Sequence, residues 1–441
     1  MIFKIGEKIT KNNKSLLIKK LLGDGGQGEV YLVNDGQKDL ALKIYTYEPS
    51  ADFVYNLKNN IYKGKPSNDF LWPLSFIEID DGHIGYLMEL RPEKYKSFIS
   101  YLNGKTVFKS LRVMLDWCIH LVNAFKRLHE RGYSYQDLND GSFFLDPENG
   151  SLLICDNDNV SANKTNLGIL GKMRYMAPEI VRRDIDPLTK EPFLPDTHSD
   201  RFSLAIILFM TLCLGNPFEG ECLKKYTIIN EKAEHEIYGN KPVYVFNNQD
   251  TSNRPIRGYH TAVLNRYPHL PSYIKEAFHR TFVDGLNDRE NGRTTELEWI
   301  RLLCKYRDEL LGCSCGKEYA YGFSEKKAHT KCPFCKKETK RFCFLEIGKN
   351  RIALQPGKRI YRIHIDKYSC EYTEVIGQVI QNKNNPAIWG IRLNLDNDVL
   401  IKDNSGNEKK INSKGVIPII NSLTIKFEDR VSGQIIMKEG K

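Results

Sequence analysis

Alternating apolar and polar positions near the start of the chain predict three β-strands around a cluster of glycines. Ser15–Leu22 and Glu29–Val33 flank the cluster, and Leu40–Tyr45 follows as a third run. A period of two residues places every second side chain on one face of a sheet. The pattern therefore predicts a small sheet whose first two strands are joined by a glycine turn.

The middle of the chain changes to a helical period. Within Ser110–Arg131 the apolar side chains recur at spacings of three and four, at Leu111, Leu115, Cys118, Val122 and Phe125. Strand-like pieces follow at Phe143–Leu145 and Leu152–Cys155. From about Asp200 to Arg307 the pattern is mostly helical, apart from a polar stretch at Tyr238–Pro255.

Apolar and polar residues alternate again in the last third of the chain, after a group of cysteines at Cys313–Cys335. Gly and Asn turns separate the alternating runs, which are Arg359–Ile365, Val375–Ile380, Ile391–Leu395 and Leu423–Phe427. The whole pattern predicts an α+β region followed by a cysteine module and an all-β segment.

Composition narrows the class of protein. The chain has 441 residues, of which 41% are hydrophobic and 27% charged, so it can fill several cores. Its longest apolar run, Phe202–Leu214, is shorter than the roughly twenty residues of a membrane helix. No secretory signal is recognisable, so we expect a cytoplasmic protein without disulfides or membrane contact. The net charge of +10 suits acidic partners, but the lysines are dispersed, which makes nucleic acid an unlikely partner.

The glycine cluster has the spacing G-x-G-x-x-G, with Gly23, Gly25 and Gly28 at the glycine positions. Dinucleotide-binding loops share this spacing, but they open into a helix. Here the next residues alternate like a strand, and backbone N–H groups between two strands can lie over nucleotide phosphates. A plain glycine-rich hairpin is the alternative.

Lys43 follows this loop inside the apolar strand Leu40-Ala41-Leu42-Lys43-Ile44. A lysine in such a strand would be costly to bury unless its charge met an anion. In the protein kinases, whose V-A-I-K strand this one resembles, the α- and β-phosphates of ATP supply that anion. Further on, Asp137 lies in Tyr135-Gln136-Asp137-Leu138, and Asp156 directly follows the strand Leu152–Cys155. Either aspartate alone would be read as part of a solvated turn.

These motifs, in this order and together with Met176-Ala177-Pro178-Glu179, resemble the eukaryotic-like Ser/Thr protein kinases over about residues 15–307. The resemblance implies a bilobal kinase domain at 1–308, with an N-lobe at about 1–90 and a C-lobe at about 91–308. It implies that Asp137 receives the proton of the substrate hydroxyl and that Lys43 holds the phosphates. It also implies that Asp156 and Ser142 bind Mg²⁺ or Mn²⁺. The implied ATP-binding residues are Gly23, Gly25, Gly26, Gly28, Val30, Ala41, Lys43, Met88, Glu89 and Leu90.

The same resemblance assigns structural roles to three residues. Asp200 would hydrogen-bond the backbone of the loop that carries Asp137, and Arg293 would pair with Glu179. The runs Y-Q-D-L-N-D-G-S-F-F and C-D-N-D-N-V also resemble a bacterial branch found in tellurium-resistance-type systems. This branch implies Ser/Thr specificity and two partners, a PP2C-type phosphatase and a von Willebrand A-domain protein.

The sequence departs from the family at the metal site. Ser142 stands where kinases have the asparagine that binds the second metal, and Asn139 and Asp140 are the neighbouring candidates to substitute for it. Asn157 replaces the phenylalanine after the metal-binding aspartate, which removes the usual hydrophobic switch.

A second departure concerns regulation. Gln136 replaces the arginine before Asp137, so a phosphate on Ser161 or Thr165 would lack its usual cationic partner. We therefore do not expect switching by phosphorylation at these positions.

The third departure is the acidic partner of Lys43. Kinases carry this acid on a helix some fifteen to twenty residues after the lysine, but Phe53–Asn68 contains no acidic residue. Glu48 and Asp52 could pair with Lys43 only if the helix were displaced, so the sequence does not identify the acidic partner of Lys43.

Four cysteines, Cys313, Cys315, Cys332 and Cys335, form the pattern C-x-C and C-x₂-C. Two tight turns can place four thiolates around Zn²⁺, which predicts a structural zinc ribbon at 309–342. His329 and Cys343 are alternative ligands that this set does not need. The remainder, 343–441, resembles a degraded forkhead-associated β-sandwich, mainly through Asn404–Phe427. Without a clear phosphothreonine pocket, it is expected to dock partners or to regulate.

Two functions remain open at this point. The first is an active ATP- and Mg²⁺-dependent kinase acting on a protein substrate. The second is a pseudokinase scaffold that binds nucleotide and recruits partners through the zinc ribbon and the β-rich segment. The two differ in whether Asp137 is needed for phosphate transfer.

Overall fold

The computed structural model describes residues 2–11, 14–79, 82–165, 167–168, 171–322, 331–338, 341–366, 368–428 and 431–439. The chain divides into two units. Unit 1 comprises Met1–Val107, His120–Leu264 and Ala277–Leu297, and unit 2 comprises Phe108–Ile119, Asn265–Glu276 and Glu298–Lys441.

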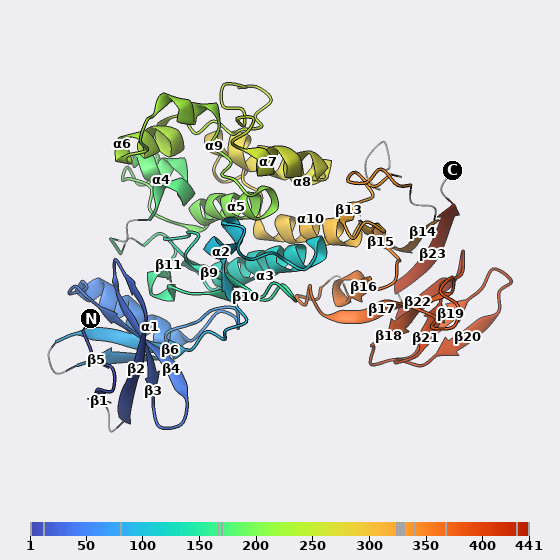
Figure 1. The fold of residues 1–441 in the computed structure, drawn as a ribbon, viewed down its shortest axis with the longest axis horizontal. Coiled ribbons are helices and arrows are strands. Elements are labelled where there is room, and N and C mark those ends of the chain that lie inside the picture. The colour runs from blue at the N-terminus through green and yellow to red at the C-terminus, as the bar shows by residue number, and fades with distance from the viewer. Residues whose placement is uncertain are drawn as a thin grey trace. The chain divides into compact units, whose positions relative to one another are not determined.

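Unit 1 begins with a six-stranded sheet in the order β1-β2-β3-β4-β6-β5, drawn in blue in Figure 1. All neighbouring strands are antiparallel. Their bounds are β1 (Lys8–Lys11), β2 (Lys14–Gly25), β3 (Gly28–Asn34), β4 (Asp39–Tyr45), β5 (Ser75–Glu78) and β6 (Ile84–Glu89). The three strands predicted around the glycine cluster are confirmed as β2, β3 and β4.

Strand β4 is buried on both faces of this sheet. Leu42 and Ile44 point into one apolar cluster, whereas Ala41 and Tyr45 pack in a second cluster against helix α1 (Ala51–Lys63). Lys43 alternates with its neighbours and therefore shares the α1 side with Ala41 and Tyr45. Helix α1 begins where the side chain of Ser50 accepts a hydrogen bond from the N–H of Phe53.

The rest of unit 1 is mostly helical. Its helices, some of which are shared with unit 2, are α2 (Phe98–Leu102), α3 (Leu111–Glu130), α4 (Pro178–Arg182), α5 (Thr197–Cys213), α6 (Glu231–Glu234), α7 (Thr261–Arg266), α8 (Ser272–His279), α9 (Gly285–Asn287) and α10 (Glu296–Asp308). Helix α5 is buried around its whole circumference, as the apolar run at its centre predicts. In the described part of the chain, no helix combines the length and apolar character needed to cross a membrane.

Short strands hold the loops between these helices. β7 (Lys96–Ser97) pairs with β9 (Phe143–Leu145), which pairs with β10 (Leu152–Ile154), and β8 (Tyr133–Ser134) pairs with β11 (Ser161–Ala162). These pairs fix the two segments that carry Asp137 and Asp156.

Unit 2 contains a hairpin of β12 (Leu310–Gly312) and β13 (Glu318–Ala320), and two larger antiparallel sheets. The sheets have the orders β15-β14-β23-β22-β19-β20 and β16-β17-β18-β21, and they pack on a shared aliphatic core. Their strands are β14 (Arg341–Ile347), β15 (Asn350–Ala353), β16 (Arg359–Tyr361), β17 (Val375–Gln381), β18 (Trp389–Leu393), β19 (Val399–Lys402), β20 (Glu408–Ile411), β21 (Val416–Pro418), β22 (Thr424–Glu428) and β23 (Val431–Glu439).

The strand predicted at Arg359–Ile365 is shorter than expected. β16 ends at Tyr361, and Arg362–His364 forms a 3₁₀ turn instead. The turn is fixed because Nδ1 of His364 accepts the N–H of Tyr361 while Nε2 lies 2.9 Å from Asp308. A side chain that caps its own backbone competes with strand pairing.

A buried arginine ties distant segments of unit 2 together. The side chain of Arg307 is 1% exposed, and Nη1 donates to Asp116 at 2.9 Å. Nη2 donates to the carbonyl of Tyr372 at 2.9 Å, and the guanidinium lies 3.4 Å from the ring centroid of Tyr361. Glu318 adds a further link, since it accepts from the N–H of Arg112. The start of α3, the end of α10 and the sandwich thus share one polar core.

Candidate active site

The glycine turn joins β2 to β3 and leaves space on its outer side. Gly25 pairs with Gly28 across the turn, so the loop lies between two strands as predicted. A Cβ on Gly23 or Gly26 would meet nothing within 4 Å. A Cβ on Gly28 would lie 2.1 Å from the carbonyl oxygen of Ile44, so this glycine is required by the packing of β3 on β4. Gly23 and Gly26 therefore leave room for a ligand, and Gly28 allows β3 to lie close to β4.

The expected adenine-pocket side chains gather in one apolar cluster. Ala41 and Met88 are 4% and 8% exposed, and the half-buried Val30 and Leu90 pack against the same cluster. Glu89 is exposed, so its side chain does not line this cluster.

Lys43 is buried below the glycine turn and lies between two carboxylates. Its Nζ donates to Oδ2 of Asp158 at 2.7 Å and to Oε1 of Gln27 at 3.1 Å, and it lies 4.0 Å from Oδ1 of Asp156. Burial opposes the charge of Lys43, but Asp158 and Asp156 raise its pKa above the usual value. The acid that pairs with Lys43 is therefore Asp158, which the sequence reasoning missed.

The other candidates for this pairing lie elsewhere. Glu48 and Asp52 are exposed, and neither makes a described contact with Lys43. A signal for Asp158 was present in the sequence, because Cys155-Asp156-Asn157-Asp158 places a second acid two residues after the first.

Asp137 and Asp156 lie on two neighbouring loops and are partly buried. Burial raises the pKa of both carboxyls, and the charge of Lys43 counteracts this effect at each of them. The side chain of Asp156 is 46% exposed. Its φ of 56° and the φ of 66° at Gln136 are left-handed, a costly backbone state for such residues. One strained residue is thus a carboxylate itself and the other directly precedes Asp137, an arrangement typical of a functional site.

The polar side chains that follow Asp137, those of Asn139 and Asp140, already make hydrogen bonds or ion pairs. Nδ2 of Asn139 donates to Oδ1 of Asp137 at 3.1 Å, and its Oδ1 accepts the N–H of Gly141 at 2.9 Å. Asp140 pairs with Lys172 at 3.2 Å. Asn139 and Asp140 are thus engaged by neighbours, whereas the fully buried Ser142 adjoins Cys155 through a backbone hydrogen bond of 2.9 Å.

Comparison with known proteins decides the family. A sequence profile of the protein kinase domain matches residues 16–282, which is more than half of the chain. The chain belongs to the protein kinase family. The predicted fold class is thereby confirmed, as an α+β kinase domain followed by a Cys₄ group and packed antiparallel sheets. The boundaries expected after residues 90, 308 and 342 remain predictions.

Curated relatives agree with this assignment. Protein kinase YegI of Escherichia coli (strain K12) is 24% identical over 357 residues, covering 78% of this chain and 52% of that protein. Ribosomal protein S6 kinase alpha-2 of Homo sapiens is 25% identical over 227 residues, covering 49% of this chain and 29% of that protein. MAP kinase-interacting serine/threonine-protein kinase 1 of Xenopus tropicalis is 27% identical over 225 residues, covering 47% and 52%. The chain spans about half or less of the length of these relatives.

Within the kinase domain, Gln136 holds the segment that follows Asp156. Its Nε2 donates to Oγ of Ser161 and to the carbonyl of Thr165, and Ser161 is fully buried in the β8–β11 pair. The amide of Gln136 thus binds this segment from the position where kinases have a phosphate-binding arginine. This contact supports the expectation that phosphorylation of Ser161 or Thr165 is not the switch.

The backbone of the Asp137 loop is held by Asp200, as the family resemblance implied. Oδ2 of Asp200 accepts the N–H of Tyr135 at 2.7 Å and lies 3.0 Å from Nε2 of His129. Nδ1 of His129 lies 2.9 Å from Glu296. Burial alone would lower the pKa of His129, but its hydrogen bonds to Asp200 and Glu296 raise that pKa to about 9.

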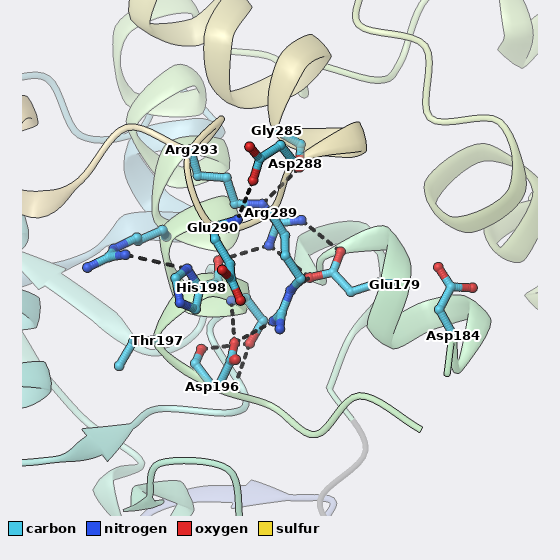
Figure 2. A network of polar contacts seen from close by, with 12 residues as sticks. Glu179, Asp184, Asp196, Thr197, His198, Gly285, Asp288, Arg289, Glu290 and Arg293 are labelled. Atoms are coloured by element: carbon cyan, nitrogen blue, oxygen red, sulfur yellow. Dashed lines mark hydrogen bonds and ion pairs between the residues drawn. The ribbon is translucent and has the colours of Figure 1, made fainter. Parts of the chain in front are cut away.

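The predicted pair of Glu179 with Arg293 is also confirmed (Figure 2). Nη1 and Nη2 of Arg293 donate to the two oxygens of Glu179 at 2.8 and 2.7 Å. Arg289 adds bonds to Glu179 at 3.3 Å and to Asp196 at 2.6 Å. Asp196 itself begins α5 with a capping box, so this network joins the end of the activation segment, Gly171–Glu179, to α5.

The four cysteines meet in unit 2. The thiol sulfurs of Cys313, Cys315, Cys332 and Cys335 all lie within 4.8 Å of one another. Backbone turns at each pair aim the thiols inward, and Gly316, with φ of 81°, completes the first turn. Four such thiolates fit tetrahedral Zn²⁺. Cys343 instead packs in the sandwich core, and His329 lies outside the described residues.

Proposed function

We propose that the chain transfers the γ-phosphate of ATP to serine or threonine hydroxyls of a protein substrate. The observation that carries this proposal is the meeting of Lys43, Asp156 and Asp137 below an open glycine turn. Lys43 lies 4.0 Å from Asp156, and its charge acts on both carboxyls. A cation for phosphates, a carboxylate for a metal and a second carboxylate for a hydroxyl are the groups that phosphoryl transfer requires.

Each residue then has a defined task. Lys43 and the N–H groups of the glycine turn hold the phosphates, and Val30, Ala41, Met88 and Leu90 enclose the adenine. Asp156 and Ser142 would hold Mg²⁺ or Mn²⁺, which would offset the charge on the phosphates of the ATP that donates the phosphoryl group. Asp137 orients the substrate hydroxyl and accepts its proton, for which a pKa raised by burial makes it a better base.

A cleft beside this site suits a protein substrate. It has a volume of about 1500 Å³ and runs along the end of the activation segment, where Asp140, Lys172, Arg182 and Arg289 contribute to its lining. Such a cleft can hold an extended peptide with its hydroxyl near Asp137. One relative is named as a serine/threonine-protein kinase, which supports the choice of acceptor.

A pseudokinase scaffold is the second candidate, and Ser142 is the observation that favours it. Its hydroxyl is a weaker metal ligand than an amide oxygen, and the neighbouring Asn139 and Asp140 are already engaged. In that case nucleotide binding would support partner recruitment by unit 2.

The remaining predictions concern metals and partners. We propose that the four cysteines hold a structural Zn²⁺, and that the forkhead-associated-like segment docks a partner. The resemblance points to a PP2C-type phosphatase and a von Willebrand A-domain protein, in the cytoplasm. Co-purification of either protein with the full chain would test this, and a matched pull-down without the β-rich segment would locate the contact.

The proposed function is tested by phosphate transfer from radiolabelled ATP to a generic protein substrate, with Mg²⁺ or Mn²⁺. We expect transfer by the wild type and none by Asp137→Asn or Asp156→Asn. Asp137→Asn should still bind ATP, because Asp137 contacts the hydroxyl rather than the nucleotide. If the wild type binds ATP but transfers no phosphate, the pseudokinase scaffold is favoured instead.

A further inference from the structure

Asp158 lies at the centre of a buried polar cluster that the proposed reaction has not yet used. Its side chain is 0% exposed, whereas that of Asp156, two residues earlier, is 46% exposed. Oδ2 of Asp158 accepts Nζ of Lys43 at 2.7 Å and the hydroxyl of Tyr45 at 2.8 Å. Oδ1 accepts the hydroxyl of Tyr86 at 3.0 Å. Asp156 therefore faces solvent, whereas Asp158, two residues later, faces the sheet.

The sheet itself builds this cluster. Lys43 and Tyr45 are two residues apart on β4, so their side chains share a face. Tyr86 is paired directly with Lys43 in the neighbouring strand β6. All three donors to Asp158 thus come from rigid, hydrogen-bonded strands. Burial opposes ionisation of Asp158, but Lys43 and the two hydroxyls lower its pKa below the usual value.

The segment that carries Asp158 is also locked. Nδ2 of Asn157 donates to the carbonyls of Leu71 and Ile154 at 2.8 and 2.9 Å. Asn157–Asn159 forms a 3₁₀ turn directly after the left-handed Asp156. A fully buried amide here replaces the hydrophobic side chain that would allow the turn to flip. The turn therefore presents Asp158 to the sheet in one fixed orientation.

Helix α1 contacts this segment through the segment's backbone and not through Asp158. Nδ2 of Asn56 and Nδ2 of Asn60 donate to the carbonyl of Val160 at 2.8 and 2.7 Å. The described residues of α1 contribute no carboxylate to Lys43. The helix is thus linked to the backbone two residues beyond Asp158, and the charge of Lys43 is balanced without it.

We propose that Asp158 is the positioning residue for Lys43, and that it takes the role for which no acid is available on α1. Two of the three N–H donors of Lys43 are held by Asp158 and Gln27, which leaves one for a phosphate oxygen. Asp158 acts on phosphoryl transfer only through Lys43. The inference rests on the proposed kinase activity and deepens it.

The test is a double-mutant cycle on the full chain, with Asp158→Asn, Lys43→Met and the double variant. At saturating ATP we expect Asp158→Asn to lower kcat by about 10²-fold, since misplacing a catalytic group by about 1 Å costs this much. In the Lys43→Met background the same substitution should cause no further loss. Adenosine affinity should stay unchanged, because adenosine carries no phosphate. Asp52→Asn, the matched exposed control on α1, should keep wild-type kcat.

Two results would overturn the inference. One is a wild-type kcat for Asp158→Asn, and the other is an equal loss in both backgrounds, which would mean a general structural effect. If Asp158→Asn does not fold, Tyr86→Phe replaces it, with a smaller loss that again disappears in Lys43→Met. A wild type without transfer would refute the proposed function alone. The cycle is then measured by ATP affinity, where non-additivity supports the inference and additivity overturns it.

Discussion

Replacing Glu179 by glutamine measures what the buried ion pair with Arg293 contributes to stability. The side chains of Glu179 and Arg293 are 7% and 1% exposed, and two hydrogen bonds of 2.7 and 2.8 Å join them. Glu179→Gln keeps the size of the side chain but removes its charge. The guanidinium of Arg293 then stays buried without its carboxylate partner.

The expected loss follows from this geometry. Breaking a buried pair by removing one partner costs about 3–5 kcal/mol. We expect the lower end, about 3 kcal/mol, because the carbonyls of His198 and Gly285 continue to accept hydrogen bonds from Arg293. The pair of Arg182 with Asp184 serves as the control, since its side chains are 31% and 36% exposed. Asp184→Asn should therefore cost at most about 1 kcal/mol.

Urea denaturation of the full chain, followed by circular dichroism, would compare the midpoints of the three proteins. Equal losses for Glu179→Gln and Asp184→Asn would refute the reasoning. The pH dependence gives a second check. Burial favours the neutral acid, but Arg293 lowers the pKa of Glu179 below its ordinary 4.5. The pair therefore stabilises the fold above about pH 4.5, and this gain is lost as the pH falls through the lower folded-state pKa. The wild type and Glu179→Gln should converge in acid.

Three further predictions test other parts of the molecule. Gly28→Ala should lower the thermal midpoint by the equivalent of about 1–3 kcal/mol, because its Cβ would lie 2.1 Å from the carbonyl of Ile44, whereas Gly26→Ala should leave the midpoint unchanged. Cys332→Ser should abolish bound zinc in metal analysis and lower the midpoint of unit 2, and a zinc content equal to that of the wild type would contradict the Cys₄ site. His129, whose pKa is raised to about 9, stabilises the fold below its ordinary pKa of 6.5, and this gain is lost as the pH rises through 9. His129→Gln should flatten the fall of the midpoint between these pH values, and an unchanged slope would contradict it.

The sequence predicts those parts of the site that depend on local pattern. The strands around the glycine turn follow from alternation, and the place of Lys43 follows from its apolar strand. The pairs made by Asp200 and Arg293 came from resemblance to a family rather than from the residues alone. Both are confirmed by the hydrogen bonds that the structure contains.

The partner of Lys43 could not be predicted in the same way. Asp158 is 115 residues from Lys43 along the chain, and the two meet only because the sheet and a 3₁₀ turn bring them together. Family resemblance directed attention to α1, where an acid is usual, but Asn56 and Asn60 of this helix contact the carbonyl of Val160 and not Lys43. The sequence places Asp158 two residues after Asp156, but no local pattern shows that its side chain faces Lys43.

The cluster around Arg307 has a consequence for the order in which the chain acquires its structure during synthesis. Asp116, at the start of α3, needs Arg307 and the sandwich that holds Tyr361 and Tyr372 to complete its surroundings. At about 5–20 residues per second, a ribosome takes roughly 10–50 s to travel from the first of these residues to the last. Until then Asp116 lacks the guanidinium of Arg307, and its ion-pair partner on α3 is Arg112, one turn earlier at 3.7 Å. Because contacts of such long sequence separation slow folding, we expect unit 2 to complete its structure late in the maturation of the protein.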